Sequence, residues 1–238
     1  MANSSVLSLV QSYCREYGLP VPTALQGSTD AGSLQMRELL TTVGEDIWDS
    51  TNWQTCLQTA SWSSVPAISQ GQITSLAPNG FSHIIADTFW DNTQRLPMQG
   101  PLSEIEWQAT VALTSSRPQY SFRLVAGSLD IYPVIPAGHA LSFMYKSRYW
   151  ITASSVRGAR YLNDADVADF PDALMKAGLR AYWLRIKQMP HKLELDKYEN
   201  LKVNEAGKNG VKPTLHMDNS ASRQRSGIYI PIGNWTVP

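Results

Sequence analysis

The spacing of apolar residues changes twice along the chain, and this change limits the folds that are open to it. Over residues 6–17 and 36–47, apolar side chains recur at steps of three and four, which is typical of amphipathic helices. From about Thr55, short runs of β-branched and aromatic residues alternate with Gly, Pro and Asn, a pattern that indicates strands and turns. Helical spacing returns after Pro171. The sequence therefore predicts an α+β fold.

Capping residues mark the expected ends of the first two helices. Gly18 and the prolines after it end the first helix, since neither residue type continues a helix well. Ser28–Asp30 is a capping cluster that should start the second helix, which ends near Asn52–Trp53.

Two more helices are expected near the C-terminal end. Asp169 can cap the first of them, and Pro171 suits its first turn. Residues 174–189 are apolar on most sides, so we expect this helix to be buried against the two N-terminal helices. Pro190 breaks it, and a more polar helix follows over residues 191–206.

The middle of the chain predicts an antiparallel sheet with one short helix. Turn residues at 126–128 and 136–138 suggest that the last three strands form a meander. Ser103 and Glu106 form a capping box, which predicts a short helix riding on the sheet through Trp107. The expected strands are Ile84–Trp90, Tyr120–Val125, Leu129–Tyr132 and Ala140–Ile151.

Together these elements predict three parts. Residues 1–54 and 169–208 should form a helical bundle, with an antiparallel β domain inserted as residues 55–168. Residues 209–238 should form an extended C-terminal arm, whose prolines oppose a place inside a regular sheet. Apolar side chains on a tether usually bind a partner surface. Packing of the arm on its own domain as an edge strand is the alternative. The candidate partner-binding residues are Arg223, Arg225, Ile228, Tyr229, Ile230, Ile232 and Trp235.

Composition narrows the class of protein. Lys plus Arg and Asp plus Glu both number 20, which argues against a protein that coats nucleic acid by charge, although a local basic patch stays open. We interpret Cys14 and Cys56 as reduced thiols that serve as small apolar residues. No signal-peptide pattern and no membrane-spanning run is present, so we expect a reducing, cytosolic setting or a particle assembled there.

The sequence contains no recognisable catalytic motif, and we expect neither a catalytic site nor a cofactor nor a metal. The histidines at 83, 139, 191 and 216 are scattered. Alternating carboxylates between Asp164 and Asp172 could bind a hard cation, but the glycine and terminal glutamate of an EF-hand are missing. A loop that contains a helix cap explains them equally well.

The eight tryptophans leave a sugar-binding module open, because aromatic rings on a β scaffold can stack on sugars. Most of them fall within apolar patterns, where core or interface positions are the simpler interpretation.

Several segments, taken in order, resemble the head-to-tail adaptor proteins of short-tailed bacteriophages, which are related in architecture to tail tubular protein A. The similarity extends over roughly residues 5–210, and the arm cannot be aligned. The matching residues are Gly27–Asp30, Trp53, Leu76–Phe81, Ile84, Thr88, Trp90, Gly100–Ser103, Glu106, Trp107, Phe122, Arg123, Leu141–Tyr145, Leu174, Gly178, Leu179, Trp183, Leu184, Lys187, Tyr198 and Glu199.

The resemblance implies a structural virion protein that is not an enzyme. It implies a ring of about twelve copies, docked beneath the portal ring and formed by head-to-tail contacts that close. Such a ring continues the DNA channel without reading DNA sequence, contacts no membrane and carries the tail nozzle. The arm would anchor on the portal or on a neighbouring subunit. Another neck or tail component, or a carbohydrate-binding module, is the alternative.

Overall fold

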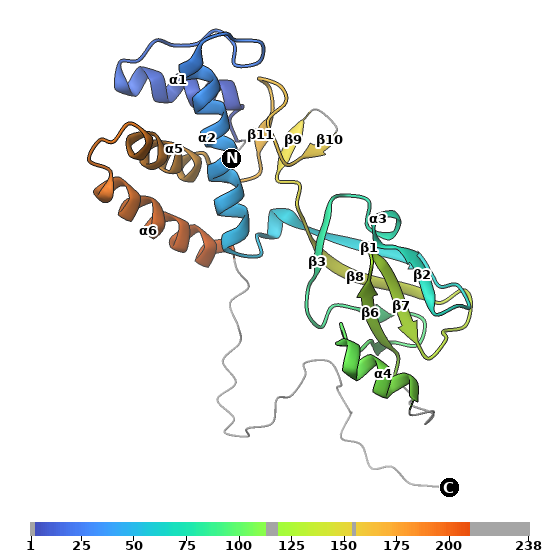
Figure 1. Ribbon diagram of the computed structural model, residues 1–238. Helices are drawn as coiled ribbons and strands as arrows, with labels where there is room; N and C mark the ends of the chain where they lie inside the picture. The colour runs from blue at the N-terminus through green and yellow to red at the C-terminus, as the bar shows by residue number, and fades with distance from the viewer. Residues whose placement is uncertain (1–2, 113–118, 154–155, 210–238) are drawn as a thin grey trace, which may run out of the picture.

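The computed structural model describes residues 3–112, 119–153 and 156–209, which form a mixed α+β fold with antiparallel sheets (Figure 1). This confirms the predicted fold class in its broad form. The six α-helices are α1 (Val6–Tyr17), α2 (Ala31–Ser50), α3 (Ile73–Leu76), α4 (Glu104–Ala112), α5 (Asp172–Ile186) and α6 (Lys192–Asn209), and a 3₁₀ turn covers Gln54–Cys56.

Local caps fix both ends of α1 and the start of α2, and Gly18 and Asp30 act where the sequence predicts a helix end and a helix start. The Ser5 hydroxyl accepts a hydrogen bond from the backbone of Ser8, and Gly18 ends α1 in the left-handed region at φ 63°. The Asp30 carboxylate caps α2 by accepting the Ser33 N–H at 2.8 Å. These hydrogen bonds join neighbours in sequence, so the pattern alone locates both helices.

The predicted start of the third long helix needs correction. Its predicted burial against α1 and α2 is confirmed for Leu174, Met175 and Leu179 but not for its C-terminal end. α5 has no side-chain cap, because Asp169 lies away from its first turn and bonds to Thr152 and Arg157 instead. The helix also ends at Ile186. Its last apolar residues, Ile186 and Met189 in the following turn, are exposed and not buried against α1 and α2.

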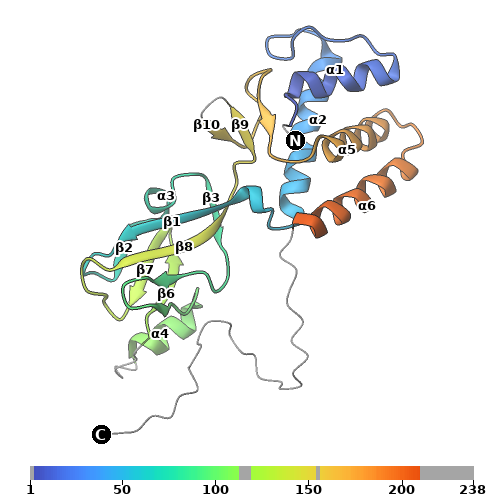
Figure 2. The same ribbon diagram turned by 180° about the vertical axis from the view of Figure 1, so that it is seen from behind.

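One apolar cluster joins the helices to three short strands. It contains buried residues of α1, α2, α5 and α6 together with Trp150, Ile151 and Ala168. Two helical glycines allow the close packing: a Cβ at Gly44 would overlap the Trp150 indole, and one at Gly178 would overlap Val43. Both views show the four helices grouped together, with β9 (Ile151–Ala153) and β10 (Val156–Gly158) on the side of α2 opposite to α6 (Figures 1 and 2).

The strands form three antiparallel sheets. The largest has the order β1-β8-β4-β5, with β3 also on β8; the other two have the orders β2-β7-β6 and β10-β9-β11. The strands are β1 (Leu57–Ser63), β2 (Ser69–Gln72), β3 (Phe81–Ile84), β4 (Trp90–Asp91), β5 (Leu96–Pro97), β6 (Ser121–Val125), β7 (Ser128–Tyr132), β8 (Ala140–Ser147), β9 (Ile151–Ala153), β10 (Val156–Gly158) and β11 (Val167–Ala168).

Three strand predictions were wrong in part. Residues 84–90 are not one strand, because the chain leaves the sheet after Ile84, adopts φ 60° at Asp87 and returns at Trp90. Residues 140–151 divide into β8 and β9, which belong to different sheets. The meander holds only for β6 and β7. The segment after β7 carries the chain to the other sheet, where β8 pairs with β1.

A second apolar cluster fills the space between the two larger sheets, and it includes Phe89, Phe122 and Phe143. The predicted capping box is present, since the Ser103 N–H donates to the Glu106 carboxylate at 2.9 Å and starts α4. The Trp107 side chain of α4 is buried, and its ring meets the ring of Tyr132 of β7 edge-on. The short helix therefore rides on the sheet as predicted.

Candidate interaction surfaces

The seven candidate partner-binding residues of the predicted arm, Arg223, Arg225, Ile228, Tyr229, Ile230, Ile232 and Trp235, lie outside the described residues. The last described residue before them is Asn209, at the end of α6, which accepts the Gln54 N–H at 3.1 Å through its side-chain oxygen. The end of α6 therefore lies beside the segment that follows α2 (Figure 1).

The carboxylates of the acidic stretch between β10 and α5 accept hydrogen bonds that stabilise the fold. Asp164 accepts the backbone N–H groups of Leu25 and Gln26 at 3.0 and 2.8 Å. Asp166 closes its own loop through the N–H groups of residues 162 and 163, and Asp172 accepts the Ser4 N–H. Each carboxylate bonds to a different backbone segment, so they do not converge on one point. The loop interpretation explains them.

Asp169 differs from the other carboxylates of this stretch because it lies against a cationic side chain. It forms an ion pair with Arg157, which also donates to the Thr55 carbonyl. Burial raises the pKa of Asp169, and the Arg157 guanidinium opposes this shift. Arg157 belongs to β10, and Thr55 lies just before β1. Arg157 therefore links the sheet β10-β9-β11 to the start of the five-stranded sheet, and Asp169 holds the guanidinium in place.

One histidine is paired with a buried carboxylate. His139 Nδ1 lies 2.7 Å from Asp91 Oδ2, and Asp91 is fully buried. Ser64 is adjacent, but its hydroxyl donates to the Pro136 carbonyl and accepts the backbone N–H of His139. The serine is thus bound to backbone and is not presented to the imidazole as a nucleophile. The pair links β4 to the loop before β8, and Ser64 separately joins the end of β1 to the same loop.

Several other sequence interpretations are testable in the described part of the chain. Cys14 and Cys56 are buried free thiols, as predicted, and burial raises the pKa of Cys56 to about 11. Trp53, Trp107 and Trp150 are buried as core residues. Within residues 3–209, gaps excluded, no group of three metal-binding side chains is close enough to hold an ion. No helix in the same ranges is long and apolar enough to cross a bilayer.

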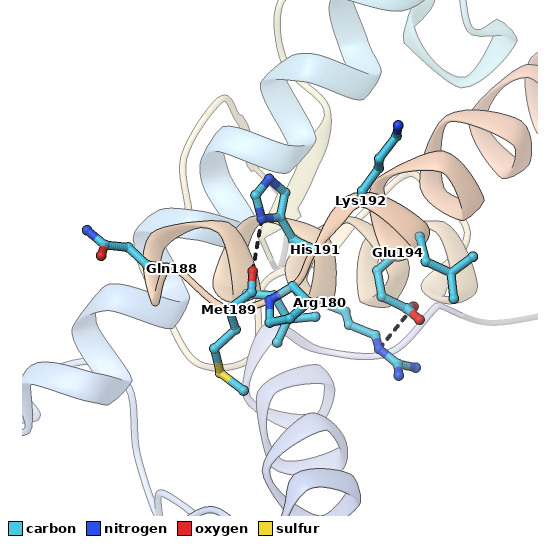
Figure 3. A pocket seen from close by; sticks show the side chains of 9 residues that line it. Arg180, Gln188, Met189, His191, Lys192 and Glu194 are labelled. Carbon is cyan, nitrogen blue, oxygen red and sulfur yellow. Dashed lines mark hydrogen bonds and ion pairs between the residues drawn. The ribbon is translucent and has the colours of Figure 1, made fainter.

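The turn between α5 and α6 carries the first exposed apolar surface, which we term the helical patch and define as Met189 and Leu193. Met189 is 51% and Leu193 66% exposed. They border a hollow of about 610 Å³ that is formed by the turn and the adjoining helix ends (Figure 3).

Two polar contacts give the turn beneath the helical patch a defined shape. His191 donates to the Met189 carbonyl at 3.0 Å, and Arg180 Nε lies 3.0 Å from a Glu194 oxygen as an ion pair. The apolar side chains are therefore presented on a fixed hairpin.

A second exposed apolar surface lies at the end of the β region that is remote from the helices. We term it the strand patch and define it as Val65, Ile68 and Val134, all exposed. Ser63 pairs with Ala140 at this end, whereas Leu57 pairs with Lys146 at the end next to α2. A strand of seven residues is about 20 Å long. The two loops that carry the strand patch therefore lie about that far from the end of β1 next to α2.

Buried polar contacts hold the strand patch in place. The Gln70 side chain accepts the Val65 N–H and donates to the Val65 and Ala67 carbonyls. Ser64 ties the same loop to the segment before β8. The Val65 side chain is thus exposed although its backbone N–H and carbonyl are hydrogen-bonded. Exposed apolar patches mark surfaces that bind partners.

A third surface is an acidic groove of about 530 Å³ between α2 and the segment after β8. We define the acidic groove by Thr42, Glu45, Asp46, Trp48, Asp49, Arg148, Trp150 and Ala159. It is bordered by three carboxylates and one arginine.

Two side chains fix the wall of the acidic groove. The Trp48 indole donates to the Ser147 carbonyl at 2.8 Å, and Lys146 Nζ lies 4.2 Å from the centre of the Trp48 ring. Lys146 also donates to the Trp48 carbonyl at 2.6 Å. Burial lowers the pKa of Lys146. These contacts join the end of α2 directly to β8.

The chain matches no family model and no curated protein in the comparisons with known proteins. The surfaces described here were not found by sequence analysis. An exposed Leu or Val has the same sequence signal as a buried one, and Glu45 and Asp49 read only as the polar face of a helix. Of the features that the sequence stressed, the acidic stretch and His139 make hydrogen bonds within the described part of the fold.

Proposed function

We propose that the chain is a structural virion protein and not an enzyme: a head-to-tail adaptor that assembles into a ring at the junction of head and tail. In this proposal the helices of residues 1–54 and 169–208 form a bundle, residues 55–168 are an inserted β domain and residues 209–238 are an arm. The ring of about twelve copies docks on the portal, continues the DNA channel and provides the platform for the nozzle. Assembly takes place in the host cytoplasm.

The observation that carries this proposal is the pair of exposed apolar patches at opposite ends of the molecule. The helical patch lies at the α5–α6 turn, and the strand patch lies at the far end of β1 and β8 (Figure 1). A subunit placed between two different partners needs two different contact surfaces. Fixed, exposed apolar side chains at both ends supply them. The helical side would face the portal and neighbouring copies, and the strand side the nozzle.

The uses of the polar residues also support a structural role. The acidic stretch, which was the best candidate for chemistry, is bonded to backbone N–H groups and to Arg157. The Asp91–His139 pair has no presented nucleophile among its described neighbours. These groups stabilise loops, which is what a scaffold for assembly requires.

The alternatives are another neck or tail component and a carbohydrate-binding module. The sugar-binding alternative needs an open aromatic face. In the acidic groove, Trp150 is 1% exposed and stacks on Phe170, and Lys146 covers one face of Trp48. The groove therefore offers poor stacking for a sugar ring. Binding of a polysaccharide by the monomer, with no need of the arm, would favour this alternative.

Three point variants test the two-ended arrangement. Leu193→Asp places a charge in the helical patch and should prevent stacking on portal rings. Ile68→Asp places one in the strand patch and should allow stacking but block attachment of the nozzle. Val203→Asp is the matched control, because Val203 is equally exposed on α6 outside both patches. Each variant is mixed with portal rings and then with the nozzle protein, and electron microscopy shows whether it stacks on the portal and whether the nozzle attaches. Equal behaviour of all three variants would refute the proposal.

The arm is tested by its removal. Deletion of residues 226–238 should leave a folded, soluble protein that no longer joins the portal, because the apolar anchors Ile228, Tyr229, Ile230, Ile232 and Trp235 are lost. Ordering such a segment costs about 2–5 kcal/mol of the interaction energy, so one arm binds modestly and a ring of arms binds firmly. Full incorporation of the truncated protein into particles would contradict this role.

A further inference from the structure

The acidic groove has features that the adaptor role does not explain. Glu45 and Asp49 are exposed on α2, and no ion pair joins either of them to another described residue. Asp46 is partly neutralised by Lys202 at 3.0 Å, and Arg148 on the opposite rim donates to the Phe81 carbonyl. Glu45 thus has no ion-pair partner among the described residues, and Asp49 has only the more distant Lys146, whose pKa it raises against the effect of burial. Both carboxylates lie beside the partly exposed Trp48. This combination suits a segment that carries both cations and apolar side chains.

One segment of the same chain has that composition. Residues 223–230 carry Arg223 and Arg225, followed after Ser226 and Gly227 by Ile228, Tyr229 and Ile230. Arginine pairs well with carboxylates in a planar, bidentate geometry. Two arginines matched to Glu45 and Asp49 would place the apolar residues that follow them toward Trp48, which is partly exposed at the groove.

The position of the arm's root makes the groove accessible to it. Asn209 bonds to Gln54, and Asp49 precedes Gln54 by five residues, so the groove lies within about 18 Å of the root. The thirteen residues 210–222 can extend up to about 45 Å. Reach is therefore ample. A tethered segment also meets its own groove at a millimolar effective concentration, which a second molecule in dilute solution does not match.

We propose that residues 223–230 dock in the acidic groove of their own chain, with Arg223 and Arg225 on Glu45 and Asp49. Docking would bury the apolar side chains of residues 228–230, and the arm would leave the groove when it binds a partner. The groove is thus a resting site for the arm in the free subunit. This inference does not depend on the adaptor role.

Disulfide trapping in the full-length protein tests the proposal. Thr42 is an exposed residue of the groove, and Ser226 follows the two arginines. The double variant Thr42→Cys/Ser226→Cys, oxidised at high dilution, should form a disulfide within one molecule at least ten times faster than Gln108→Cys/Ser226→Cys. Gln108 is a matched control because it is exposed on α4, on the β side of the molecule. The native thiols are buried and do not compete.

Charge reversal identifies the pairing. Adding Glu45→Arg and Asp49→Arg to the trapping variant should slow disulfide formation about tenfold, which corresponds to about 1.4 kcal/mol. Adding Arg223→Glu and Arg225→Glu as well should restore the rate, since the charges are then exchanged.

Two results would overturn the proposal: a trapping rate equal to that of the control, or disulfides only between two molecules, which would assign the groove to a neighbouring copy. The adaptor role is judged separately, by stacking on portal rings. A chain that traps its arm but never stacks would keep the groove assignment and refute the adaptor.

Discussion

The contact between Gly44 and Trp150 gives the sharpest prediction about stability. A Gly to Ala change in the interior of a helix normally stabilises a protein by about 0.5–1 kcal/mol. At Gly44 the added Cβ would overlap the six-membered ring of Trp150. That ring cannot move aside, because it stacks on Phe170 and meets Tyr161 edge-on, each at 5.6 Å between centres. Overpacking of this kind costs about 1–3 kcal/mol.

We therefore expect Gly44→Ala to lower the free energy of unfolding by about 2 kcal/mol, which is the upper end of the overpacking cost less the helix gain. The melting temperature should fall by about 4–8 °C for a chain of this size. Gly207→Ala is the matched control: it also lies in a helix, but a Cβ there meets nothing within 4 Å. It should stabilise the protein or leave it unchanged. Urea unfolding followed by circular dichroism measures both.

A double-mutant cycle separates the overlap from other causes. Trp150→Phe removes the ring atoms that the Gly44 methyl group would meet, so Gly44→Ala should cost much less in that background than in the wild type. If Gly44→Ala is as stable as Gly207→Ala, or if its cost is the same with Phe at position 150, the packing argument is wrong.

The remaining stability predictions concern buried polar groups. Cys14 and Cys56 should not react with an aromatic disulfide reagent at pH 8 until the protein is unfolded, and rapid labelling of the native protein would contradict their burial. Asp164→Ala should cost about 1–3 kcal/mol of unfolding free energy, because it leaves two backbone N–H groups without a partner, whereas Asp196→Ala on the exposed face of α6 should cost little. For Lys146, burial lowers the folded pKa below 10.5, so the unfolded state binds more protons between these two values and stability rises with pH in that window. The stability of the wild type relative to Lys146→Met should therefore increase as the pH approaches 10.5, and a difference that does not change with pH would exclude this titration.

Elements fixed by neighbours in sequence were predicted well. The caps at Ser5 and Asp30 and the capping box at Ser103 each bond to residues three positions away. A local pattern contains all the information that such an element needs, so α1, α2 and α4 could be located from the sequence.

Elements fixed by distant contacts were predicted less well. β8 pairs with β1, which lies about eighty residues earlier, and nothing in the local pattern of either strand names its partner. Asp169 looked like a helix cap, but its carboxylate is held by Arg157. The sequence also did not show which apolar side chains are exposed, because Met189 and Leu193 have the spacing of core residues and yet border the open α5–α6 turn. The candidate surfaces depend on this tertiary information.

We propose that this chain forms a ring on the portal, and one mixing experiment tests this proposal most directly. The purified protein is combined with portal rings from the same genome and the mixture is imaged by negative-stain electron microscopy. The adaptor proposal predicts a second ring stacked on one face of the portal, with a copy number that symmetry analysis of the images can count. Bare portals beside free subunits at high protein concentration would contradict it.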